Sequence, residues 1–340
     1  MHITREWGVR ARILLEQGRA ALPGRDGRRR LAGFADSVRA AFPDLSEREA
    51  HDLHARYRAS MRKFGLMKDY LASLSADQLG AFLDRHVQVE GRETLDMLRG
   101  SAEPVIFVTP HYGSFPAACL KLIREIGHEK TINAFYNPPS ANRSSEGFET
   151  LFSRLGYGFH ALFNDDTAVL KALRVLKRGE ALTMMPDVFD INGHVLYVPF
   201  FGRLVPAMAG TALFALKSRA TVIVGYGCPG EGIESTLKLG QPLRIERSDS
   251  LENDIATLTA AIFQEMEAQI RLHPEHWIYT KDIGTLLAGR LAVDARGDEE
   301  WLAGMEAASA QFDAFLPEWR FVLRELRAMQ HDAPLEVANA

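Results

Sequence analysis

The spacing of apolar residues changes character near residue 100. Before that point they recur every three or four residues, which predicts amphipathic helices. The helical stretches are 8–21, 28–41 and 46–73. Ser46 followed by Glu49 fits a capping box at the start of the third stretch. We therefore expect a helical N-terminal region over residues 1–100 that packs on the rest of the protein.

From residue 104 onward, short apolar runs alternate with helical patterns. The runs are Val105–Val108, Thr131–Phe135, Ala181–Met185, Val195–Val198 and Thr221–Tyr226. The helical patterns are 116–127, 146–156, 166–178, 208–219 and 251–272. Strands that alternate with helices predict an α/β fold over residues 101–282, with a largely parallel central sheet and helices on both faces. Asn192-Gly193 marks a turn, and the run that follows it is expected to form a hairpin with a neighbour.

After Asp282 the pattern becomes helical again. Apolar residues at helical spacing follow Trp301 and then Trp319, and Pro317 separates the two stretches. We expect a helical C-terminal extension over residues 283–340.

Charge and cysteine content exclude several classes of protein. A net charge of −4 argues against general nucleic-acid binding, which requires a basic surface. Cys119 and Cys228 stand far apart, without the spacing of a disulfide framework or a zinc site, so a cytoplasmic location is the simplest prediction. His160, His194 and His276 show no metal-ligand spacing either, and we expect no metal.

The N-terminal segment is rich in arginine and lacks a long apolar run. Ile13-Leu14-Leu15 is far too short for a signal peptide or a membrane span. The first 40 residues hold nine arginines against four acidic residues. Such a basic amphipathic start could lie peripherally on the anionic cytoplasmic face of the inner membrane. A solvated helix face explains the same pattern equally well.

His111 is the most informative residue, because it stands where an apolar strand ends and a helix begins. A histidine held there can take a proton from a hydroxyl or an amine through one ring nitrogen, provided that a partner orients the other. Pro116 suits the first turn of the following helix. The N–H groups of Gly113, Ser114 and Phe115 could then point at an anion or an oxyanion. A covalent acyl-enzyme on Ser114 or Cys119 is disfavoured, because no Gly-x-Ser-x-Gly elbow is present.

Five blocks in order resemble the lipid A late-acyltransferase family. They are Phe42–Ser46, Pro110–Phe115, Leu182–Asp187, Val198–Gly202 followed by Gly210–Ala212, and His273–Ile278. The resemblance covers residues 40–282. It implies a glycerol-3-phosphate-acyltransferase-like fold and an enzyme that moves acyl groups from an acyl carrier protein. No cofactor is implied beyond the phosphopantetheine of the carrier protein or of CoA that carries the donor acyl group.

The chain departs from the family pattern beside the histidine. Family members carry an Asp or Glu five residues after it, which orients and charges the imidazole, and this chain has Pro116 there. Asp187, at the end of another strand on the same sheet edge, is our first choice for the missing carboxylate. Asp190 and Glu146 are weaker alternatives. The resemblance thus assigns catalysis to His111, with Asp187 as its expected partner.

The acceptor is expected to differ from lipid A. In the family that the chain resembles, basic residues after the central helix and after the terminal Trp motif suit phosphorylated sugar acceptors. The corresponding stretches here, 156–160 and 277–282, are poorer in arginine, the side chain best suited to bidentate phosphate recognition. Further residues that could contact a substrate lie at strand ends, in loops and in the blocks that resemble the family. A purely structural role is the alternative for each of them. They are Tyr136, Asn137, Arg143, Phe200, Phe201, Arg203 and Thr211.

We therefore expect an acyltransferase that moves an acyl group from a carrier-protein or CoA thioester to a hydroxyl or amine. The acceptor would be a small molecule, or an intermediate tethered to a carrier, in a specialised biosynthetic pathway. Two alternatives stay open. The protein could be an acyl-thioester hydrolase, or it could hold an acyl carrier protein without catalysing a reaction.

Overall fold

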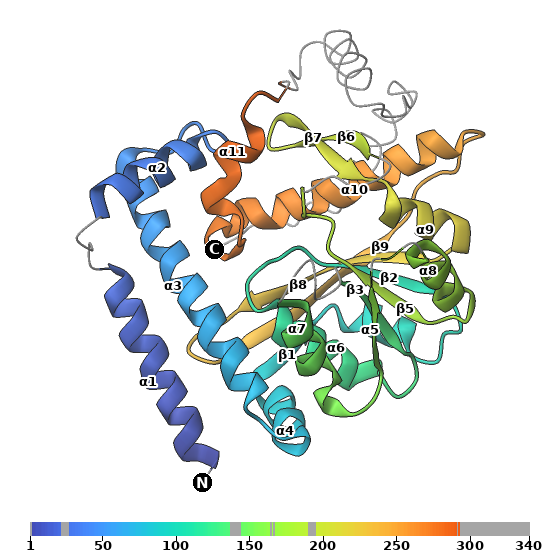
Figure 1. Cartoon of the computed structure of the whole chain (residues 1–340), viewed down its shortest axis with the longest axis horizontal. Helices are drawn as coiled ribbons and strands as arrows, with labels where there is room; N and C mark the ends of the chain where they lie inside the picture. The colour runs from blue at the N-terminus through green and yellow to red at the C-terminus, as the bar shows by residue number, and fades with distance from the viewer. Residues whose placement is uncertain are drawn as a thin grey trace.

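A computed structural model describes residues 2–21, 27–136, 144–163, 165, 167–189, 195–290 and 292. Its centre is a seven-stranded sheet in the order β1-β9-β8-β2-β5-β3-β4 (Figure 1). The strands are β1 (Val87–Glu90), β2 (Val105–Val108), β3 (Ile132–Tyr136), β4 (Phe159–Phe163), β5 (Ala181–Met184), β8 (Thr221–Pro229) and β9 (Ser235–Leu243). Neighbouring strands are parallel except β8 and β9, which form an antiparallel pair. The predicted α/β fold with a largely parallel sheet is confirmed.

Alternate residues of the central strands face two separate hydrophobic cores. Val105 and Phe107 pack with α4 (Ala76–His86), α6 (Phe115–Ile126) and α7 (Ser144–Phe152). Ile106 and Val108 pack with α8 (Ala168–Lys177), α9 (Gly210–Ser218) and α10 (Leu251–Leu272). All four side chains are buried. Helices therefore cover both faces of the sheet, which is why these strands read as continuous apolar runs.

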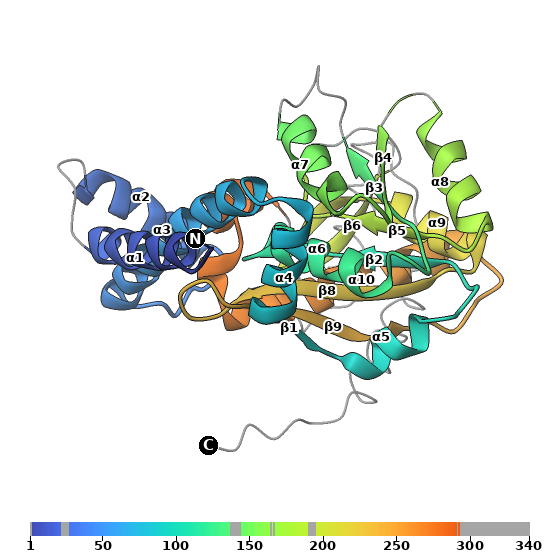
Figure 2. The same ribbon diagram turned by 90° about the horizontal axis from the view of Figure 1, so that it is seen from below.

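The N-terminal helices form a layer beside the sheet (Figure 2). They are α1 (His2–Ala21), α2 (Gly27–Arg39) and α3 (Glu47–Ala72). Ser46 and Glu49 form the predicted capping box at the start of α3. The region expected to be helical also contains β1, which pairs with β9, and it ends with α5 (Arg92–Leu98). An edge strand of the sheet thus lies inside the N-terminal hundred residues.

A two-stranded hairpin stands apart from the main sheet. It consists of β6 (Val195–Phe200) and β7 (Arg203–Met208). Its turn is Phe201-Gly202, and both residues have positive φ angles, 50° and 70°. Such a turn follows the right-handed twist of paired strands. The hairpin therefore turns at Phe201-Gly202, whereas Asn192-Gly193 lies outside the described residues.

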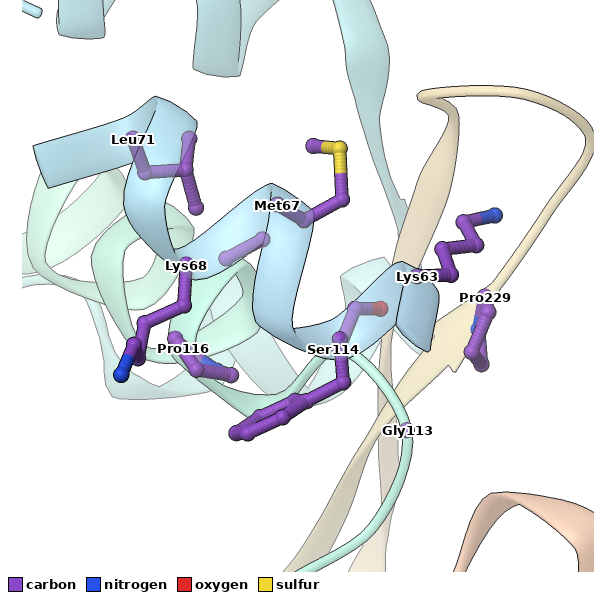
Figure 3. Close-up of a pocket in the computed structure, with 10 residues that line it drawn as sticks. Lys63, Met67, Lys68, Leu71, Gly113, Ser114, Pro116 and Pro229 are labelled. Atoms are coloured by element: carbon purple, nitrogen blue, oxygen red, sulfur yellow. The ribbon is translucent and has the colours of Figure 1, made fainter. Parts of the chain in front are cut away.

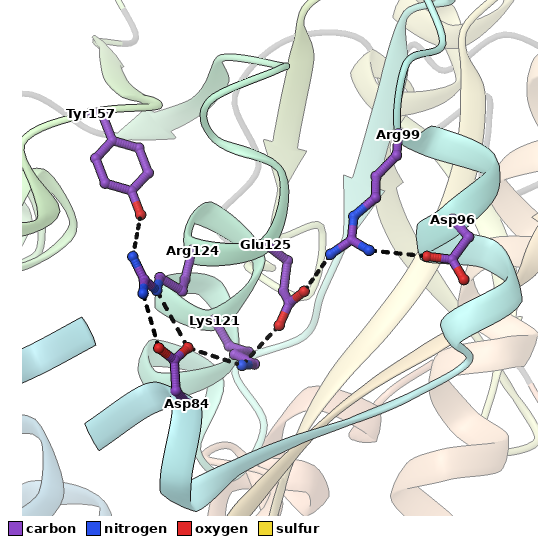
Figure 4. A network of polar contacts seen from close by, with 7 residues as sticks. All are labelled: Asp84, Asp96, Arg99, Lys121, Arg124, Glu125 and Tyr157. Atoms are coloured by element: carbon purple, nitrogen blue, oxygen red, sulfur yellow. Dashed lines mark hydrogen bonds and ion pairs between the residues drawn. The ribbon is translucent and has the colours of Figure 1, made fainter. Parts of the chain in front are cut away.

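A polar network holds α6, the helix that begins four residues after His111 (Figure 4). Asp84 of α4 accepts a hydrogen bond of 2.9 Å from Arg124 Nη2. Lys121 Nζ lies 2.8 Å from Glu125 Oε1, one turn along the same helix. The side-chain hydrogen bond from Arg124 lowers the pKa of Asp84 below its usual value. The contact between Arg124 and Asp84 holds α6 against α4.

Three short helical segments follow α10. They are the 3-10 helices η2 (Pro274–His276) and η3 (Thr280–Asp282) and the α-helix α11 (Ile283–Leu287). A further 3-10 helix, η1 (Ser153–Leu155), follows α7. The helices predicted around Trp301 and Trp319 lie outside the described residues. Within the described part of the chain, no helix combines the length and the apolar character needed to cross a membrane.

Candidate active site

His111 and Asp187 come together at the carboxyl ends of two adjacent parallel strands. In the β2–β5 register Val108 pairs with Met184, and each of the two polar residues stands three positions beyond its strand. Parallel strands end at one edge of a sheet, so the chain segments after them meet there. The two residues are 76 positions apart in the sequence and lie in direct contact.

Asp187 accepts three hydrogen bonds. His111 Nδ1 lies 2.9 Å from Oδ1, and the backbone N–H of His111 donates to Oδ2 at 2.8 Å. The indole Nε1–H of Trp277 donates to the same Oδ2 at 2.9 Å. The Asp187 side chain has no solvent exposure, whereas the imidazole is 23% exposed. The carboxylate is thus held from two sides, and the histidine ring reaches the surface.

The contact with Asp187 settles which nitrogen of His111 is free. A carboxylate only accepts, so Nδ1 carries the proton and Nε2 keeps a lone pair. Among the described residues, none forms a hydrogen bond with Nε2. Burial by itself would lower the pKa of His111, but the charge of Asp187 and its hydrogen bond outweigh this effect and raise it above the usual value. The ring is a stronger base than a free imidazole.

Aromatic side chains enclose the pair. The ring of Tyr279 meets the imidazole edge-on, with centroids 5.6 Å apart, and Phe115 does so at 5.7 Å. Trp277 is fully buried and packs against Phe200 and Phe201 of the hairpin, at 5.9 and 6.3 Å. The indole and the hairpin therefore form a dry layer behind Asp187.

Trp277 is the residue whose role the sequence did not reveal. It stands 90 positions after Asp187, in a block noted only for its resemblance to the family. The backbone of this segment also touches the histidine loop, because Gly113 N–H donates to the carbonyl of His276 and Ile278 N–H donates to that of His111. A buried tryptophan needs a hydrogen-bond acceptor for its indole N–H. This requirement is the one signal from which a carboxylate partner of Trp277 could have been predicted.

The backbone amides after His111 are already used. The N–H of Gly113 donates to His276, that of Ser114 to Gly227, and that of Phe115 to Tyr112. The expectation that these three amides point at an anion is therefore wrong for this conformation. Close packing of the loop against the end of β8 is the reason. A Cβ at Gly113 would lie 2.3 Å from the carbonyl oxygen of Gly227.

Pro116, which occupies the family's acid position, lines a small cavity of about 20 Å³ between α3 and the start of α6 (Figure 3). Lys63 and Met67 of α3 lie across from it. Ser114 also lines this cavity, and its buried hydroxyl has no hydrogen-bond partner among the described residues. Neither His111 nor Asp187 is among the residues that line it.

The remaining predicted contacts are spread over the molecule. Tyr136 ends β3 and is largely buried, and burial raises the pKa of its hydroxyl. Arg203 donates to the carbonyl of Arg290, and Thr211 is buried in the first turn of α9. Glu146 is exposed on α7 and has no described contact with His111. The other predicted positions lie outside the described residues: Asn137, Arg143 and Asp190.

One group of the described residues has side chains close enough together to bind a metal ion, which the sequence pattern did not predict. The ligand atoms of His273, Glu275 and His276 lie within 4.8 Å of one another. Two of the three already have protein partners, since Arg56 Nε is 3.5 Å from Glu275 and Ser60 Oγ is 2.9 Å from His276 Nδ1. These contacts satisfy the group without an ion, and we assign it no metal role.

Comparison with known proteins gives a family. The model of the bacterial lipid A biosynthesis acyltransferases matches residues 10–282, which is most of the chain. The match includes the histidine loop, strand β5 with Asp187 beyond its end, and the segment of Trp277. No curated protein matches the chain closely enough to be reported as a relative.

Proposed function

Because the chain belongs to the bacterial lipid A biosynthesis acyltransferase family, we propose that His111 and Asp187 form its catalytic pair. The reaction proposed is transfer of an acyl group from a carrier-protein or CoA thioester to a hydroxyl or amine. The observation that carries this proposal is the contact between His111 Nδ1 and Asp187 Oδ1, at 2.9 Å. Asp187 takes the role that the family gives to an acid at the position of Pro116.

The proposed chemistry needs only a base and an activated donor. Nε2 of His111 takes the proton from the acceptor as its oxygen or nitrogen attacks the thioester carbonyl. Asp187 keeps the imidazole in the productive tautomer and stabilises the imidazolium that forms. When the tetrahedral intermediate collapses, the C–S bond breaks and the imidazolium returns its proton to the leaving thiolate. The products are the acylated acceptor and the free thiol.

The presence of a carboxylate beside His111 weighs against the non-catalytic alternative. That alternative rested on the acid missing from the position of Pro116, and Asp187 supplies one from a neighbouring strand. Hydrolysis stays a second candidate, because the imidazole is 23% exposed and water could replace the acceptor. We propose an acceptor other than lipid A, on the scarcity of arginine in 156–160 and 277–282.

The test is thiol release from a panel of acyl-carrier-protein and acyl-CoA donors, with products identified by mass spectrometry. His111→Ala is expected to lower turnover by about 10²–10⁴-fold, the usual contribution of a general base. His160→Ala is the matched control, because His160 is an exposed histidine on β4. Equal turnover in the wild type and His111→Ala would refute the assignment. Efficient acylation of a lipid A precursor would refute the proposed acceptor class.

A further inference from the structure

The proposed reaction places negative charge on the carbonyl oxygen of the thioester. When the acceptor attacks, the carbonyl carbon becomes tetrahedral and its oxygen becomes an oxyanion, which enzymes stabilise with hydrogen-bond donors fixed in advance. Backbone N–H groups often have this role, but those of Gly113, Ser114 and Phe115 already donate to carbonyl groups of the protein. The donor therefore has to come from a side chain near His111.

Several hydroxyl groups close to His111 in the sequence cannot reach a bound substrate. Tyr112 has no solvent exposure, and its hydroxyl is bonded to Gln269 inside the protein. Thr109 is buried, and its hydroxyl donates to the neighbouring carbonyl. The hydroxyl of Ser114 lines the cavity beside α3, and His111 does not line that cavity. These three groups are excluded as donors to the oxyanion.

Tyr279 differs from them because its phenol stands beside the catalytic histidine and is open to solvent. Its ring meets the imidazole of His111 edge-on, with centroids 5.6 Å apart, and meets the indole of Trp277 in the same way at 5.7 Å. The residue is only partly buried. Within the described part of the chain, no group forms a hydrogen bond with its hydroxyl. A substrate bound at His111 would therefore meet an unused O–H donor.

The segment that carries Tyr279 is fixed to both members of the catalytic pair. The N–H of Ile278 donates to the carbonyl of His111 at 3.0 Å. The indole of Trp277, one residue earlier, donates to Asp187 at 2.9 Å. The phenol is thus held in place before the substrate arrives. A donor fixed in this way needs no reorganisation when the charge forms, which makes it effective.

Tyr279 also keeps its proton under the conditions in which His111 is a neutral base. Burial raises the pKa of the Tyr279 hydroxyl from the usual 10.0 to about 12, and the charges of Asp187 and Asp282 act in the same direction. The phenol is therefore a hydrogen-bond donor at neutral and mildly alkaline pH. It does not compete with His111 for the role of base.

We propose that the hydroxyl of Tyr279 donates a hydrogen bond to the oxyanion that forms on the thioester carbonyl. The acceptor atom bonds to the carbonyl carbon, its proton passes to His111 Nε2, and the C=O electron pair moves to the oxygen that Tyr279 contacts. When the C–S bond breaks, this pair re-forms the carbonyl and the phenol is unchanged. The inference rests on the proposed function and adds a third catalytic residue to the pair.

The test is thioester turnover by Tyr279→Phe, which removes the hydroxyl and keeps the ring against His111. We expect kcat to fall by about 10²–10³-fold, the usual effect of one lost oxyanion donor, and KM to change by less than about threefold. The acidic limb of the pH–rate profile should stay in place, because the contact between His111 and Asp187 is untouched. Tyr157→Phe is the matched control and should turn over like the wild type, because Tyr157 is also partly exposed but its hydroxyl contacts Arg124 (Figure 4).

A second measurement uses binding in place of turnover. A trifluoromethyl ketone analogue of an acyl-CoA donor forms a tetrahedral hydrate that resembles the oxyanion, whereas the corresponding thioether has no carbonyl oxygen. Tyr279→Phe should weaken binding of the ketone by about tenfold or more, because a group that acts on the transition state also binds its analogue. Binding of the thioether should not change. Isothermal titration calorimetry measures both, and an equal loss for the two analogues would overturn the proposal.

The turnover assay separates this inference from the proposed function. If Tyr279→Phe turns over within about threefold of the wild type while His111→Ala is inactive, the role of Tyr279 is wrong and the catalytic pair stands. A shift of the acidic limb in Tyr279→Phe also overturns the proposal, because the hydroxyl would then act on His111 and not on the oxyanion. No turnover by the wild type with any donor would overturn both.

Discussion

At the scale of single residues, Trp277 has an unexpected place beside Asp187. We expect Trp277→Phe to lower turnover about tenfold, because the loss of one hydrogen bond from a buried carboxylate costs on the order of 1–3 kcal/mol. Asp187 Oδ2 would keep only the backbone N–H of His111 as a donor. More negative charge would then remain on the carboxylate, which raises the pKa of His111 further. The acidic limb of the pH–rate profile should move to higher pH.

The control for this prediction is Phe201→Leu. Phe201 packs against the same indole, with centroids 6.3 Å apart, and has no polar group to offer Asp187. It should change stability without moving the acidic limb. If Trp277→Phe and Phe201→Leu give the same pH profile, the indole N–H has only a packing role.

Lys63 is a buried cation whose titration should affect stability. It is 8% exposed, and burial lowers the pKa of its ammonium from the usual 10.5 to about 8. Between pH 8 and 10.5 the unfolded chain therefore binds more protons here than the folded one, so the free energy of unfolding rises with pH in that window. Lys63→Met should remove on the order of 2 kcal/mol of this rise, measured by urea unfolding at both ends of the window.

Lys68→Met provides the comparison, because Lys68 stands on the same helix and is 43% exposed. Its pH dependence of unfolding should match the wild type. An unchanged pH dependence in Lys63→Met would show that Lys63 titrates normally in the folded protein.

At the scale of elements, the loop between β2 and α6 depends on close backbone contact. Gly113 has a φ of +53°, and a Cβ there would meet Gly227 O at 2.3 Å. Gly113→Ala is expected to lower the free energy of unfolding by about 2 kcal/mol or more, through strain and collision. Turnover should fall as well, because the loop carries His111.

Gly147→Ala is the matched control for Gly113→Ala. Gly147 lies in α7, and nothing stands within 4 Å of its added Cβ. In a helix the exchange should be neutral or stabilising, by up to about 1 kcal/mol. Thermal unfolding compares the two variants. Equal melting temperatures would contradict the account of the loop.

The elements themselves were predictable where their pattern was strong. The runs at 105–108 and 181–185 are strands β2 and β5, and the pattern at 251–272 is helix α10. Strand β9, which lies between β1 and β8, was missed because Lys238, Gly240 and Pro242 interrupt its apolar pattern. Helix α4 was missed although Ser75 and Gln78 form a capping box, which was a readable signal.

At the scale of the whole molecule, the site joins three distant parts of the chain. The contact of His111 with Asp187 spans 76 positions, and that of Trp277 with Asp187 spans 90. The sequence pattern was enough to suggest Asp187 as the partner of His111, because each of these two residues follows an apolar run. It could not establish that these runs become neighbours in the sheet, since β5 enters between β2 and β3. Strand order is a tertiary property that local periodicity does not carry.

The same arrangement predicts the effect of truncation. The catalytic pair, Trp277 and both described cores all precede residue 288. A chain that ends after Arg290 should therefore fold cooperatively and keep its thioester turnover within about threefold, because no described core contact is lost. Circular dichroism and the thiol-release assay test this. Loss of turnover in a folded truncated protein would place part of the active site beyond residue 290.

The central claim is that Asp187 makes His111 the base. It is tested most directly by the pH dependence of thioester turnover in the wild type and in Asp187→Asn. Asp187 raises the pKa of His111, so wild-type turnover should increase with pH through a midpoint above the usual 6.5. In Asp187→Asn the midpoint should shift to lower pH and the maximal rate should fall by about 10²-fold or more. An unchanged midpoint and rate would show that Asp187 does not act on the catalytic histidine.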